Sequence, residues 1–149
     1  MDINDIRLRH MIKALADCAV ETSSKAMQDM MKHIVDCAKD NGGSVKCDIF
    51  LAEALCSMMK HTVNTVLTSA NFQGIPNIPD EYKQLASTIL EIAADRFSEE
   101  YLGFVKVKNL TTLDEHIKAL KAVEIYLTVR DYSGFCEYVY NKVREKEHE

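Results

Sequence analysis

Residues 3–40 read INDIRLRHMIKALADCAVETSSKAMQDMMKHIVDCAKD and contain neither glycine nor proline. Apolar or small residues recur in steps of three and four along the whole stretch, which places them on one face of an α-helix. We therefore predict a helix that buries this face against the rest of the chain. The face comprises Leu8, Ile12, Leu15, Ala19, Ser23, Ala26, Met30, Ile34 and Cys37.

The predicted helix is long for the chain that carries it. At 1.5 Å per residue, a continuous helix over residues 3–40 measures about 55 Å, whereas a compact domain of this size is about 35–40 Å across. Either the helix breaks within the polar stretch 21–25, or it extends beyond the domain and needs a partner. No capping box begins at Thr22, Ser23 or Ser24, which favours a continuous helix.

Glycine and proline residues divide the remaining sequence into further helical segments. Residues 45–71 carry only four charges, and their apolar residues surround most of the helix, which is typical of a helix in the centre of a core or in an interface. The segment 72–79 is expected to form a rigid loop. A third helix is expected to begin near Pro79, because proline is favoured in the first helical turn, and to end at Gly103.

The last two helices have their own start signals. Thr112-Leu113-Asp114-Glu115 is a capping box, so the fourth helix is expected to begin there and to run to about Arg130. The fifth helix is expected to run from about Tyr132 into the charged tail. Before the fourth helix, residues 104–108 alternate between apolar and basic with period two, which predicts an extended linker or a short strand.

The sequence thus predicts an all-α fold class, a compact bundle of five or six helices with a long N-terminal helix. A length of 149 residues matches one ordinary domain, and no repeat of solenoid period is present. Residues 1–149 are therefore expected to form a single helical domain. The composition, 47% hydrophobic and 28% charged, agrees with a folded globular chain.

Charge and hydropathy restrict the kinds of partner. The 18 basic residues are outnumbered by 23 acidic ones, and a net charge of −5 argues against broad electrostatic binding to nucleic acid. The apolar runs are too short to cross a membrane, and the charged N-terminus does not have the pattern of a signal peptide. We expect a cytoplasmic protein that binds neither membrane nor nucleic acid.

The five cysteines indicate the same compartment. An odd number of cysteines without a secretory signal predicts reduced thiols. Four of them lie on apolar helix faces and are expected to react slowly with thiol reagents. Cys47 follows a glycine-containing turn at the start of a helix, where a thiol is activated, so it is expected to be the reactive one.

No motif for catalysis or cofactor binding is present. The sequence lacks the nucleophile elbow, the P-loop, the dinucleotide-binding glycine pattern and the zinc-protease helix motif. Glu91 and Asp95 lie opposite the apolar face of their helix, as solvated residues do. Cys56 and His61 diverge by about 140° on a helix, so they do not chelate a metal as a pair. We therefore expect no catalytic residue, no metal site and no cofactor.

Methionines and aromatic residues are unevenly distributed along the chain. All seven methionines lie at or before Met59, and five of the eleven aromatic residues lie within residues 126–140. Tyr138 and Val139 point about 100° apart on a helix, so part of this aromatic cluster is expected to be exposed. Exposed tyrosine is enriched in recognition surfaces.

These patterns favour a non-enzymatic protein–protein interaction module, an adaptor, regulator or inhibitor that acts by binding and occluding a partner. If the long first helix overhangs at its N-terminal part, the apolar residues there are left for a second copy, so we expect a homodimer through this helix, with the second helix as the next candidate. The sequence does not identify any other partner. The predicted interaction residues are Leu8, Ile12, Leu15, Tyr138 and Tyr140.

The alternative function belongs to another class. A small-molecule-binding or metal-dependent helical enzyme would need a pocket lined by His33, Asp36, Glu91 or His116. Convergence of these four side chains in space would favour the enzyme, and scattered positions would favour the interaction module.

Overall fold

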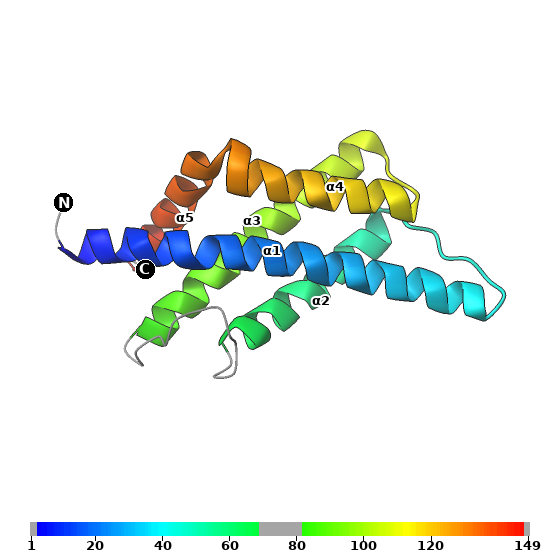
Figure 1. Cartoon of the computed structure of the whole chain (residues 1–149), viewed down its shortest axis with the longest axis horizontal. Helices are drawn as coiled ribbons and strands as arrows, with labels where there is room; N and C mark the ends of the chain where they lie inside the picture. The colour runs from blue at the N-terminus through cyan, green and yellow to red at the C-terminus, as the bar shows by residue number, and fades with distance from the viewer. Residues whose placement is uncertain (1–2, 69–81, 148–149) are drawn as a thin grey trace.

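The structure is a computed structural model that describes residues 3–68 and 82–147 (Figure 1). It confirms the all-α prediction: five α-helices form a bundle, the first of them long, and no strand occurs within the described ranges. The loop predicted over 72–79 and the helix start predicted near Pro79 lie outside these ranges. The helices are α1 (Ile3–Asp40), α2 (Ile49–Thr68), α3 (Lys83–Lys108), α4 (Leu113–Ile125) and α5 (Tyr132–Glu147), with a π-helical turn, η2 (Tyr126–Arg130), after α4.

Helix α1 is continuous over its 38 residues and packs against α2, α3, α4 and α5 (Figure 1). It does not break in the polar stretch, because Ser23 and Ser24 are small enough to be completely buried against neighbouring helices. A Schellman motif ends it: the N–H of Gly43 donates to the carbonyl of Ala38 at 2.8 Å, and Gly42 takes the left-handed conformation with φ 75°.

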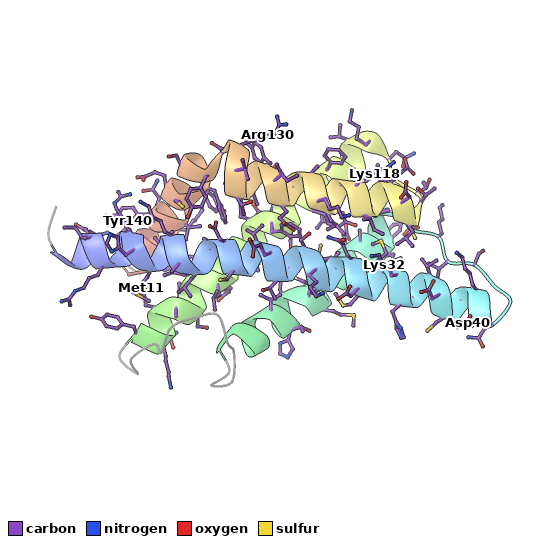
Figure 2. All side chains as sticks on the ribbon, viewed as in Figure 1. Met11, Lys32, Asp40, Lys118, Arg130 and Tyr140 are labelled. Carbon is purple, nitrogen blue, oxygen red and sulfur yellow. The ribbon has the colours of Figure 1, made fainter. Side chains whose placement is uncertain are left out.

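The overhang of α1 lies at its C-terminal end. No residue from Lys32 to Lys46 is buried, and Figure 2 shows Asp40 at the far tip of the helix, beyond the other helices. By contrast, the side chains of Leu8, Ile12 and Leu15 are only 5%, 1% and 2% exposed. The expectation that these three residues are exposed for a partner is wrong, because α1 has neighbours along its whole N-terminal half.

Helix α3 does not end at Gly103. It continues to Lys108 and ends at Asn109, whose φ of 52° is left-handed. The predicted linker or strand over 104–108 is therefore wrong. Val105 lies one helical turn beyond the buried Tyr101 and is buried itself, so this last turn and a half is held by packing, which outweighs the cost of about 1 kcal/mol for glycine in a helix.

The capping box of α4 is confirmed. The Thr112 hydroxyl accepts the backbone N–H of Glu115 at 3.3 Å, and the Glu115 carboxylate accepts the backbone N–H of Thr112 at 3.2 Å. The Thr112 hydroxyl also donates to this carboxylate at 2.9 Å, which is the main reason why the pKa of Glu115 is lowered. The helix then changes to a π-helical turn, in which the N–H of Asp131 donates to the carbonyl of Tyr126 at 2.8 Å.

Candidate interaction surface

The two tyrosines predicted as interaction residues make contacts within the protein. The ring of Tyr140 lies 3.9 Å below the guanidinium of Arg9, and its hydroxyl donates to Asp5 at 3.0 Å. The guanidinium of Arg96 lies 4.5 Å from the ring of Tyr138. Both rings are half-buried, and they fasten α5 to α1 and to α3 (Figure 2 labels Tyr140 beside α1).

The exposed apolar side chains of α2 form the candidate surface. Helix α2 lies at the edge of the bundle, where α1 and α3 are its close neighbours (Figure 1). Phe50 is 76% exposed and Met58 is 58% exposed, with the exposed Ala54 between them. The spacing of four residues places the three side chains in a row along the helix. We call Phe50, Ala54 and Met58 the α2 stripe.

The opposite face of α2 lies in the core. Leu55, Cys56, Met59 and Val63 are buried there, together with Ala52. This explains why the helix is apolar around most of its circumference: one face belongs to the core and the other to the surface. A sequence pattern of this kind indicates either a central helix or an interface helix, and the position at the edge of the bundle supports the second interpretation.

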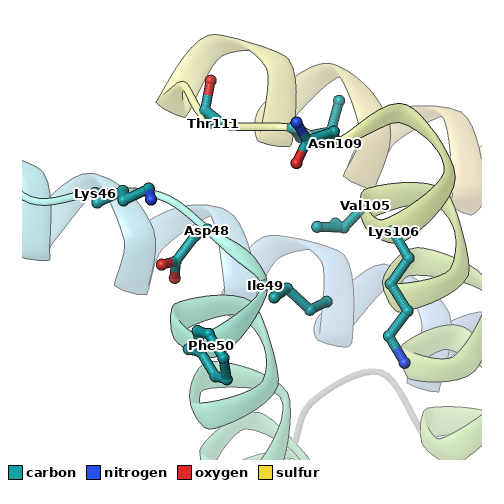
Figure 3. A pocket seen from close by; sticks show the side chains of 9 residues that line it. Lys46, Asp48, Ile49, Phe50, Val105, Lys106, Asn109 and Thr111 are labelled. Atoms are coloured by element: carbon teal, nitrogen blue, oxygen red, sulfur yellow. The ribbon is translucent and has the colours of Figure 1, made fainter.

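A groove lies at the N-terminal end of α2, where this helix meets the end of α3 and the turn before α4. Its volume is about 400 Å³. Figure 3 shows Lys46 and Lys106 on opposite sides of it. It is lined by Lys46, Asp48, Ile49, Phe50, Val105, Lys106, Asn109, Leu110 and Thr111.

Buried hydrogen bonds fix the backbone at this groove. The imidazole of His116 is completely buried, and its Nε2 lies 2.7 Å from the carbonyl oxygen of Cys47. Because a carbonyl only accepts, Nε2 donates, and Nδ1 therefore accepts the hydroxyl of Tyr101 at 2.6 Å. Burial raises the pKa of Tyr101, so the hydroxyl keeps the proton that it donates. The segment that carries Lys46 into α2 is thus fastened to α3 and α4.

The four residues of the alternative enzyme are scattered over the molecule. His33 and Asp36 are exposed on the overhanging part of α1, and His116 is buried between α3 and the start of α2. Glu91 lines a second groove between α2 and α3, beside the ion pair that Lys60 and Asp95 form at 3.2 Å. Among the described residues, no group of three or more histidine, cysteine or acidic side chains is arranged to hold a metal ion.

The cysteines are placed differently from the sequence-based expectation. Cys47 is buried, and burial raises the pKa of its thiol. Cys37, expected on the buried face of α1, is exposed because it lies on the overhang, with its Sγ 3.5 Å from Nε2 of His33. Burial raises the pKa of Cys56 to about 11.

We therefore expect Cys37, not Cys47, to react first with a maleimide in the native protein. Peptide mapping by mass spectrometry after short labelling gives the order of reaction. Cys37→Ser should remove the fast phase, whereas the matched change Cys56→Ser should leave it intact, since thiolate character and access control the rate. Labelling of Cys47 as fast as that of Cys37 would contradict this placement.

The fold and this surface together define a helical bundle whose edge helix, α2, exposes the large apolar side chains of Phe50 and Met58. Comparisons with protein families, with curated proteins and with solved structures find no match. A search of the described helices for a membrane-spanning segment finds none that is both long and apolar enough.

Proposed function

We propose that this protein is a non-enzymatic protein–protein interaction module, an adaptor, regulator or inhibitor that acts by covering part of a partner. The observation that carries the proposal is the α2 stripe, in which two large apolar side chains and the alanine between them are exposed on a helix whose opposite face is in the core. Exposed apolar patches of this kind mark sites of protein association. The scattered positions of His33, Asp36, Glu91 and His116 support the module over the enzyme.

The side chains of the α2 stripe are of the kinds that contact other proteins. Phe50 supplies a large rigid ring, and aromatic anchors dominate the energy of many interfaces. Met58 is unbranched and polarizable, so it adapts to the shape of the opposing surface. Burying each of these side chains against a partner contributes about 1.5–3 kcal/mol.

A second copy of the chain is the occupant that we propose for the α2 stripe. A straight row of apolar side chains is complementary to itself about a two-fold axis, which is the commonest symmetry of protein dimers. Two copies of Phe50 and Met58 together contribute about 6–12 kcal/mol. Because association costs about 4–15 kcal/mol, the homodimer is expected to be weak and to depend on concentration.

Light scattering across the micromolar range tests this dimer. We expect the mass to rise from 16.9 kDa toward twice that value as the concentration increases. Met58→Glu places two carboxylates at the symmetric contact and should keep the mass at 16.9 kDa without unfolding the chain. The matched control is Val107→Glu, at an apolar residue that is 81% exposed on α3 and lies outside the stripe.

A mass of 16.9 kDa at every concentration would reject the second copy as the occupant. A dimer that survives Met58→Glu but dissociates in Val107→Glu would move the interface to α3. A second experiment tests the interaction surface apart from the dimer. A photoreactive amino acid replaces Ala54, so that light crosslinks any protein that lies on the α2 stripe. If it traps neither a second copy nor another protein in extract of the native cell, the α2 stripe is rejected as the interaction surface, and the proposed function loses the observation that carries it.

A further inference from the structure

The groove at the N-terminal end of α2 has an apolar floor. Val105 and Leu110 are buried beneath it, and Ile49 is half-buried beside them. Phe50 stands at its rim with most of its ring exposed. A volume of about 400 Å³ is enough for one large apolar side chain and the groups next to it.

Two lysines border this floor. Lys46 and Lys106 lie on opposite sides of the groove (Figure 3), and within the described part of the chain neither forms an ion pair. Among the described residues that line the groove, Asp48 is the one acidic residue. Its carboxylate accepts the N–H of Leu51 at 3.1 Å and so serves the first turn of α2. The described residues that line the groove thus carry two positive charges and one negative charge, in a chain of net charge −5.

The groove is formed before any ligand arrives. The hydrogen bond from His116 to the carbonyl of Cys47 holds the backbone between Lys46 and Asp48, and left-handed Asn109 fixes the turn on the other side. The groove therefore loses little conformational entropy when a ligand binds, which favours affinity.

We propose that this groove binds a short acidic–apolar segment of a partner protein, in which carboxylates flank one large apolar side chain. The apolar side chain fills the space above Val105 and Leu110, against the ring of Phe50. The carboxylates before and after it reach Lys46 and Lys106. Because the two lysines lie on opposite sides of the floor, an extended segment that crosses it contacts both.

This inference rests on the proposed function, since it gives the chemistry of one partner for an interaction module. It does not depend on the homodimer, because Lys46 and Lys106 lie outside the α2 stripe. Phe50 belongs to both surfaces, so a partner bound in the groove covers the first residue of the stripe.

The test uses a fluorescein-labelled, capped peptide with the sequence Gly-Asp-Glu-Phe-Glu-Asp-Gly and a matched peptide in which asparagine and glutamine replace the acids. Fluorescence anisotropy with the full chain measures binding. We expect the acidic peptide to bind more tightly than the neutral one and to weaken as salt is added. The double change Lys46→Glu with Lys106→Glu should weaken it by about tenfold or more.

A peptide with lysines in place of the acids should in turn prefer the doubly changed protein. The matched control, Lys118→Glu with Lys121→Glu on α4, alters the net charge by the same amount and should leave binding unchanged. Circular dichroism confirms that each variant is folded. Equal binding of the acidic and neutral peptides, or an equal loss in the control, would overturn the proposal. So would the absence of any binding up to millimolar protein. The dimer is measured separately by mass, so either proposal can fail alone.

Discussion

Ile12→Glu is expected to unfold the protein. The side chain of Ile12 is 1% exposed within the cluster of buried residues that α1 shares with its neighbours. The change removes about 1.5–3 kcal/mol of apolar burial and adds several kcal/mol for an unpaired buried carboxylate. That sum is comparable with the whole stability of a domain, about 5–15 kcal/mol. Loss of the helical circular dichroism signal and of the cooperative melting transition would show the effect.

Ile6 on the same helix supplies the matched control. It is 44% exposed, so Ile6→Glu should change the free energy of unfolding by no more than about 0.5 kcal/mol. A variant Ile12→Glu that remains folded and helical would contradict the burial of this residue, and would return the N-terminal half of α1 to the list of surfaces open to a partner.

His116→Ala is expected to destabilise the fold strongly without abolishing it. The change leaves a cavity and removes the partner of two buried groups, the Tyr101 hydroxyl and the Cys47 carbonyl. The expected loss is about 3–5 kcal/mol, which lowers the midpoint of thermal unfolding by about 6–20 °C. Calorimetry measures it, with His10→Ala at an exposed position as the control.

A second variant separates the hydrogen bonds from the cavity. Tyr101→Phe removes one hydroxyl and almost no volume, so it should cost less than His116→Ala while leaving His116 short of one partner. If His116→Ala melts within a degree of the unchanged protein, the hydrogen-bonded chain does not hold the segment before α2, and the groove is not preformed.

Local signals in the sequence predicted much of the fold. The spacing of apolar residues predicted the helix over residues 3–40, although a break within 21–25 stayed open, and the capping box predicted the start of α4. Both signals depend on residues within one or two helical turns of each other. Gly103 gave a wrong end for the third helix, because the burial of Val105 stabilises the continuation of α3 to Lys108. Propensity is a weak signal wherever such packing is available.

Which residues lie exposed was harder to predict, because exposure also depends on packing between helices that are distant in the sequence. Helix length showed that α1 either breaks or overhangs, but which end of a continuous helix lies free depends on where α4 and α5 pack. The partner of Tyr140 is Arg9, which is far away in the sequence, so no local pattern reveals that this ring is occupied. The groove brings together Lys46 and Lys106 from separate helix ends. The one signal that did point to the surface was the nearly uncharged helix of residues 45–71.

The ion pair between Asp5 and Arg144 has a consequence for synthesis of the chain. The two residues are 139 positions apart and meet at 3.1 Å, where α5 packs on the beginning of α1. A ribosome that adds about 5–20 residues per second needs about 7–28 s to make the intervening chain. During that time the apolar side chains at the start of α1 have emerged while α5 does not yet exist. Helix α1 is thus synthesised well before α5, which completes its cover, and the nascent chain presents a surface to chaperones that the folded protein hides.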